Sequence, residues 1–117
     1  MNTVSLVGNL ATDVELKDVG EKRVASFLLA VARAGRDGGA DFVWISAWER
    51  QAELCSEYLG KGRQVAVEGR LKSRTWEQDG RRRDAIEIVA RRIEFLGAPR
   101  HDEGELAEVV PFEPAAV

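Results

Sequence analysis

The chain has 117 residues, enough for one domain with a core but too few for two domains of ordinary size. Its hydrophobic fraction of 44% is typical of globular proteins, and its single cysteine excludes an internal disulfide framework and a cysteine-based zinc site. The net charge is −3, but residues 102–117 hold five acidic residues and no Lys or Arg, which leaves 17 basic against 15 acidic residues before them. A mildly basic body with an acidic tail is therefore expected, and the overall charge does not exclude an anionic partner.

Four segments rich in β-branched and apolar residues precede residue 49. They cover residues 3–10, 14–19, 23–33 and 41–48. The third has its main apolar residues on one parity, as a half-buried strand requires. These are Ala25, Phe27, Leu29 and Val31. Residues 35–40 (GRDGGA) predict a mobile loop, because three glycines in six positions leave the backbone little restraint.

The apolar period then changes to that of a helix over residues 49–61, with glycines at 60 and 62 marking the end. Its apolar positions are Ala52, Leu54, Cys55, Tyr58 and Leu59. Residues 64–76 and 84–96 return to period two, and the QDGR sequence at 78–81 predicts a hairpin turn between them.

The order is thus three to four strands, one helix and a two-stranded hairpin. A single helix between the third and fourth strands of a five-stranded set predicts an all-β OB-fold barrel with one helix and an extended C-terminal hairpin. We expect this domain to span residues 1–97. Residues 98–117 have little to bury and predict an acidic, disordered tail. Met1 leads directly into a strand-like segment without the regions of a secretory signal, so a cytoplasmic protein is expected.

Aromatic residues gather on one parity of the 41–48 strand. That parity holds Phe42, Trp44, Ser46 and Trp48, whereas the other holds Val43, Ile45 and Ala47. The small and β-branched set suits the narrow interior of a five-stranded barrel, which turns the aromatic set outward. Exposed aromatic surface of this extent is typical of a binding face, although one such ring alone is as often structural, and Trp44 could equally pack against a second subunit.

Cations share a parity with a tryptophan in the 64–76 strand. This parity reads Glu68, Arg70, Lys72, Arg74 and Trp76, and the turn beyond it adds Arg81, Arg82 and Arg83. Arg33 and Arg36 flank the glycine loop. Unpaired bases stack on aromatic rings, and Lys and Arg neutralise phosphates, so the combination indicates single-stranded nucleic acid. A duplex hides its base faces and would leave the rings unused.

Nothing in the sequence indicates an enzyme, a metal site or a cofactor. The only histidine, His101, lies at the start of the tail, where a general base would be poorly held. Cys55 is interpreted as a small core residue of the helix, the acidic residues are scattered, and no role is assigned to Glu87.

Several segments together resemble the bacterial single-stranded DNA-binding protein family. They are VSLVGNLATDVEL, VASFLLAVAR, AELCSEYLGKGRQVAVEGRLKSRTW and DGRRRDAIEIVARRIEFLG, within residues 1–97. The resemblance implies an OB fold, a homotetramer in preference to a dimer, and a nucleoid-associated protein that protects single-stranded DNA in replication, recombination and repair.

Carried over by position, the resemblance places Phe42, Trp48 and Trp76 at stacking positions and Arg74 at a basic one. The chain departs where Trp44 stands at an often basic position and Gly35 at a frequent stacking tryptophan. One platform is therefore expected to be missing.

The tail departs as well. The family's acidic end closes on a Phe whose terminal carboxylate docks replication and repair enzymes. Here Pro111 and Phe112 are candidate docking residues, but five further residues follow them and no aspartate run precedes them.

Two other functions stay open from the residues alone. One is a dimeric OB protein of the primosomal type that holds replication proteins together. The other is a single-stranded RNA binder, because stacking does not report the sugar.

Overall fold

Six strands and one helix form in this computed structural model, which describes residues 1–35 and 38–97. The elements are β1 (Val4–Leu10), β2 (Glu15–Val19), β3 (Lys22–Ala32), β4 (Ala40–Trp48), α1 (Arg50–Tyr58), β5 (Gln64–Gln78) and β6 (Arg81–Phe95). The predictions for Arg36 and for residues 98–117, including His101, Pro111 and Phe112, lie outside the described residues.

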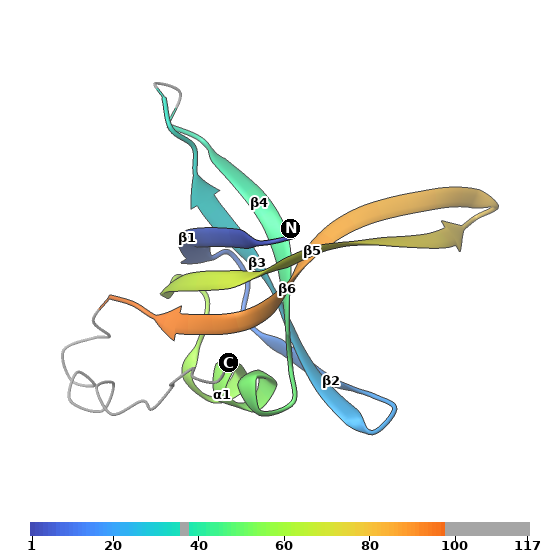
Figure 1. The fold of residues 1–117 in the computed structure, drawn as a ribbon, viewed down its shortest axis with the longest axis horizontal. Coiled ribbons are helices and arrows are strands. Elements are labelled where there is room, and N and C mark those ends of the chain that lie inside the picture. Colours follow the sequence, from blue (N-terminus) through green and yellow to red (C-terminus); the bar gives the residue numbers. More distant parts are fainter. Residues whose placement is uncertain (36–37, 98–117) are drawn as a thin grey trace.

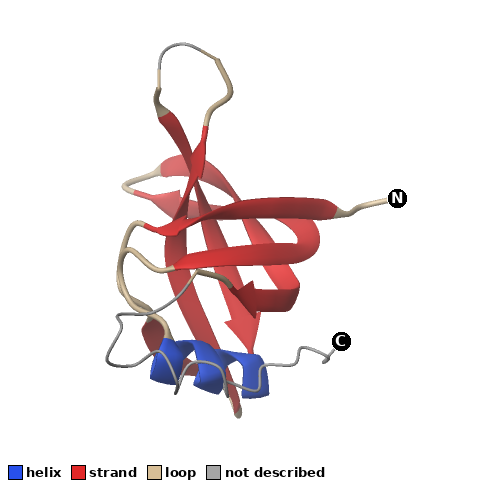
Figure 2. Cartoon of the chain, turned by 90° about the vertical axis from the view of Figure 1, so that its left-hand side faces the viewer, coloured by secondary structure: helices blue, strands red, loops and turns tan. Residues whose placement is uncertain are grey.

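Five of the strands close into a ring (Figure 1). The sheet order is β1-β5-β6-β4-β3-β2, and β1 also pairs with β3, which joins the two ends. β1 meets β3 at Leu29 and Ala30, and β2 continues along the same strand from Ser26 to Lys22, so β1 and β2 act as one interrupted barrel strand. The helix lies at one end of the ring (Figure 2). The prediction of a five-stranded OB-fold barrel with one helix is confirmed.

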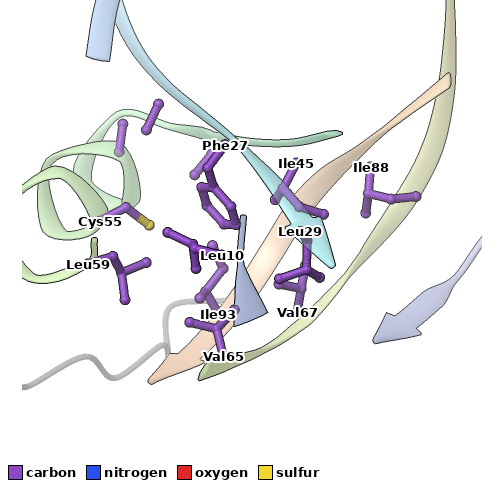
Figure 3. Packing of buried hydrophobic residues seen from close by; sticks show 13 residues of the cluster. Leu10, Phe27, Leu29, Ile45, Cys55, Leu59, Val65, Val67, Ile88 and Ile93 are labelled. Atoms are coloured by element: carbon purple, nitrogen blue, oxygen red, sulfur yellow. The ribbon is translucent and has the colours of Figure 1, made fainter. Parts of the chain in front are cut away.

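The barrel interior is filled by alternate residues of the strands, as their parity predicts (Figure 3). Ala25, Phe27 and Leu29 of β3 are fully buried, and Ile45 and Ala47 of β4 face the same core. The helix contributes Ala52 and Cys55, and Leu59 follows directly after it. Burial raises the pKa of the Cys55 thiol to about 12, because the thiolate would lose its hydration. The interpretation of Cys55 as a core residue is confirmed.

Two glycines allow the strands of the ring to approach one another. A Cβ atom on Gly8 of β1 would lie 2.3 Å from the carbonyl oxygen of Ala30 on β3, where the ring closes. A Cβ atom on Gly69 of β5 would lie 2.2 Å from the carbonyl oxygen of Val89 on β6. Both positions exclude a side chain, because the neighbouring atom is main chain and cannot move aside by rotating a bond.

The bulge beside Gly69 changes the inward parity of β6. Glu68 pairs with Arg92 and Gly69 with Ala90, so Arg91 has no counterpart on β5. Ile88 and Ile93, five residues apart, therefore both point into the core. The helix holds the bulge in place, since Gln51 Nε2 donates a hydrogen bond of 2.7 Å to the carbonyl of Arg91, the bulged residue.

Beyond the barrel, β5 and β6 continue as a two-stranded hairpin that projects to one side (Figure 1). Residues 70–84 are exposed along its whole length. Asp79 and Gly80 both have positive φ angles, 54° and 77°, which is the two-residue turn that suits the twist of a hairpin. The predicted turn is confirmed, and the two strands run two and three residues further toward it than their patterns indicated.

The helix is shorter than the predicted 49–61. It begins at Arg50, because Glu49 has φ 56° and ψ −122°, a conformation that side chains disfavour and that cannot continue a helix. It ends at Tyr58, and Leu59 is already extended. The Glu49 N–H donates to the Arg23 carbonyl at 2.7 Å, which holds Glu49 in this conformation.

No helix in residues 1–35 or 38–97 is long and apolar enough to cross a membrane.

Two polar side chains at and just after the end of β1 hold the chain that follows the helix. Asn9 Nδ2 donates to the Gly62 carbonyl at 3.0 Å, and Asp13 Oδ1 accepts from the Lys61 N–H at 2.9 Å. These side chains tie the 60–62 turn to the end of β1, which sets where β5 enters the barrel.

Replacing Gly69 by Ala is expected to lower the free energy of unfolding by roughly 1–3 kcal/mol, because the new methyl group overlaps the Val89 carbonyl. Thermal or urea unfolding measures the loss. Gly60→Ala is the matched control, since its methyl group would come no closer than 3.6 Å to Asp13 Oδ1. Equal losses in both variants would show that close approach is not what requires glycine at position 69.

Candidate nucleic-acid interface

The outward side of β4 carries the aromatic residues that the parity predicted. Phe42 is 59% exposed and Trp44 47% exposed, whereas Trp48, at the helix end of the strand, is half-buried. Ser46, between the two tryptophans, is buried at 5%. The strand therefore presents two open rings and one partly covered ring along its length.

Strand pairing extends this face from β4 onto the hairpin. β4 runs parallel to β6, with Trp44 beside Glu87, and β6 places Glu87 opposite Lys72 of β5. Residues directly opposite each other in a sheet share a face. The face that includes Trp44 therefore also carries Arg70, Lys72, Arg74, Trp76, Arg83, Ala85, Glu87 and Val89. The structure thus brings together the two sets that the sequence could only place on separate strands.

A shallow hollow lies at the junction of the barrel and the hairpin. It is lined by residues of five strands: Glu15, Lys17, Ser26, Trp44, Ile45, Ser46, Arg74, Ala85, Ile86 and Glu87. One wall is an indole ring, and the others supply two cations and two carboxylates. Sequence reasoning missed the contribution of β2 and β3, because these strands have no aromatic or strongly basic pattern of their own.

Trp76 stands on the hairpin with one ring face already in contact with a cation. It is 40% exposed, and the guanidinium carbon of Arg74 lies 5.4 Å from the centroid of its ring. This distance is typical of a cation–π pair. A further ring can stack on the opposite face.

The three consecutive arginines of the turn do not act as one cluster. Arg81 lies opposite Gln78 and Arg83 opposite Trp76, so both share the aromatic face. Arg82 lies opposite Glu77 on the other face, where its Nε is 3.7 Å from Asp84 Oδ1. Alternation along a strand separates neighbours that the sequence presents as a run.

Arg33 follows β3 and is bound to Asp41 at the start of β4, with a shortest nitrogen–oxygen distance of 3.2 Å. Its guanidinium also donates to the Ala40 carbonyl at 3.3 Å. Arg33 therefore closes the base of the loop between β3 and β4. Its predicted contact with nucleic acid stays a prediction.

Glu87 also lies on this face, and no role is evident for it from sequence patterns. Its side chain is only 14% exposed. Ser46 Oγ donates to its Oε2 at 3.0 Å, and its Oε1 lies 3.7 Å from Arg74 Nε. The parity of Ile86 and Ile88 could have indicated that Glu87 turns outward, but its partners lie on other strands.

The face offers rings for stacking and cations for charge neutralisation, which is non-covalent chemistry. In the described part of the chain no three His, Cys, Asp or Glu residues are grouped closely enough to hold a metal ion.

Comparison with known proteins agrees with this chemistry. The sequence model of the Single-strand binding protein family matches residues 1–96. The chain is 39% identical to the single-stranded DNA-binding protein of Treponema pallidum over 92% of its own length and 67% of the relative's. It is 43% identical to single-stranded DNA-binding protein 3 of Clostridium acetobutylicum, over 82% and 71%. It is 42% identical to the single-stranded DNA-binding protein of Bacillus cereus, over 90% and 65%. The chain thus spans about two thirds of the length of these relatives.

Proposed function

Because the chain belongs to the single-strand binding protein family, we propose that it binds single-stranded DNA across the joined outer face of β4, β6 and β5. The observation that carries this proposal is the shared face itself, on which the exposed aromatic rings of β4 lie beside a hairpin that carries Trp76 and exposed cations.

Stacking of bases on the aromatic rings supplies part of the binding free energy. An unpaired base that stacks on an aromatic side chain contributes about 1–3 kcal/mol, and the contact tolerates any base. Phe42, Trp44 and Trp76 are open to such stacking, while Trp48 offers a smaller area. Rings at both ends of β4 and on the hairpin favour a strand that crosses the face rather than a single bound nucleotide.

Phosphates supply the salt-dependent part of binding. Arg70, Lys72 and Arg83 project on the face of the rings, and Arg81 adds a further charge at its outer end. Each phosphate that a cation neutralises releases condensed counterions. The protein holds DNA in this proposal and performs no reaction on it.

Two further properties follow from family membership as proposals. The protein acts as a homo-oligomer, with the tetramer favoured over the dimer. Because its ligand is DNA, it works in the cytoplasm at the nucleoid.

Tryptophan fluorescence tests the proposal directly. Oligo-dT is expected to quench the emission strongly, because bases stack on Trp44 and Trp76, whereas a duplex of the same length leaves it nearly unchanged. Titration of both ligands at one salt concentration makes the comparison. Equal quenching by the duplex would contradict single-strand binding.

Trp76→Ala is expected to weaken oligo-dT binding by roughly 1–3 kcal/mol, because one stacking surface is lost. The hairpin lies outside the core, so the melting temperature should hardly change. Tyr58→Ala is the matched control: Tyr58 is 41% exposed, like Trp76 at 40%, but belongs to the helix. An equally large loss of affinity in Tyr58→Ala would contradict the proposal that DNA binds on the face that carries Trp76.

Arg83→Ala and Arg82→Ala separate the two faces of the hairpin. Loss of Arg83 is expected to reduce the slope of log K against log salt by about 0.7, the contribution of one phosphate contact on a single strand. Loss of Arg82, one residue away on the opposite face, should leave the slope unchanged. The reverse order of effects would place the DNA on the other side of the hairpin.

A further inference from the structure

A carboxylate lies within the face that the proposed function assigns to an anion. Glu87 sits between Trp44 of β4 and Lys72 of β5 and is 14% exposed at its side chain. A negative charge there repels phosphate, and partial burial removes some of its own hydration. Its presence therefore needs a reason other than contact with the DNA backbone.

The partners of Glu87 form a line across three strands. Ser46 on β4 donates to one carboxylate oxygen at 3.0 Å, which fixes the orientation of the group. The other oxygen faces Arg74 on β5, with Oε1 3.7 Å from Nε. Arg74 in turn lies over the ring of Trp76, 5.4 Å from its centroid. The series Ser46, Glu87, Arg74 and Trp76 links the barrel to the hairpin.

Arg74 differs in this respect from the other cations of the face. Its guanidinium is shared between a carboxylate and an aromatic ring, and its charge is partly balanced before any DNA arrives. A phosphate that approached it would compete with Glu87. Condensed counterions are released in proportion to the phosphates neutralised, so a cation already paired contributes little to the salt dependence.

We propose that Glu87 is a positioning residue that holds Arg74 against one face of Trp76, so that Arg74 supports the stacking ring and does not act as a phosphate contact. Trp76 then accepts a base on its other face alone, with the guanidinium beneath it. The proposal rests on the proposed function, and it deepens that function by dividing the cations of the face into two classes.

Glu87→Gln is the test, because glutamine keeps the length of the side chain and can still bond Ser46, but carries no charge. Freed Arg74 should become available to phosphate, so the slope of log K against log salt for oligo-dT should steepen by about 0.7. In the wild-type protein, Arg74→Ala should weaken binding with almost no change in slope. In the Glu87→Gln background, the same Arg74→Ala change should reduce the slope by about 0.7.

Asp84→Asn is the matched control. Asp84 lies on the same strand, three residues away, but on the opposite face of the hairpin, opposite Thr75. Its removal changes the net charge equally and should leave the slope as in the wild type. A steepening equal to that of Glu87→Gln would show a general charge effect and overturn the proposal. An unchanged slope in Glu87→Gln, or a loss of about 0.7 on Arg74→Ala in the wild type, would overturn it as well.

A second measurement needs no DNA. In a Trp44→Phe, Trp48→Phe background, Trp76 is the only tryptophan of the chain, and acrylamide quenching reports how open its ring is. Glu87→Gln should raise the quenching constant, because Arg74 leaves the ring, and Ser46→Ala should raise it less. No change in either variant would refute the positioning role, whether or not oligo-dT binds, whereas failure of the wild type to bind oligo-dT would refute the proposed function alone.

Discussion

Closure of the ring through main-chain contacts at two glycines is the constraint on which the rest of this structure depends. At Gly8 the first strand reaches β3, and at Gly69 the fifth strand passes close to β6. A barrel of five strands has a narrow interior, which is filled by Phe27, Leu29 and Ile45 together with smaller residues. Once those positions are occupied, every residue of the opposite parity must turn outward.

The binding face is a consequence of that geometry. Large rings on β4 are excluded from the interior and are displayed on the outside, where Phe42 and Trp44 stay open. Exposure of aromatic rings to water is unfavourable in free energy, and a ligand that stacks on them covers that surface. The parallel pairing of β4 with β6 then brings the cations of the hairpin onto the same side. Aromatic and basic chemistry therefore meet because of strand order, although they lie more than 20 residues apart in the chain.

The hairpin is stabilised differently from the barrel. From Arg70 to Asp84 it has no core beneath it, and its strands are held by their mutual ladder and by side-chain contacts such as that of Thr75 with Asp84 at 3.0 Å. Its base is tied to the barrel through Ser46, Glu87 and Arg74, and Asn2 exchanges two hydrogen bonds with the main chain of Leu71. An exposed arm of this kind can display Trp76 and several arginines without any requirement from packing.

Much of this protein follows from local patterns in its sequence. Alternation in β3 and β4 is enough to assign Phe27 to the core and Trp44 to the surface, since side chains of a strand alternate by covalent geometry. The DG turn and the change to helical period in the fifties are local in the same sense, although the start of the helix depends on Glu49 and its end on Leu59. Tertiary structure alone decided the remainder. The bulge at Arg91 shifts the parity of β6, and Glu87 meets Ser46 and Arg74. These relations join residues of different strands, and their register is set by where the ring closes, which no single segment of the sequence contains.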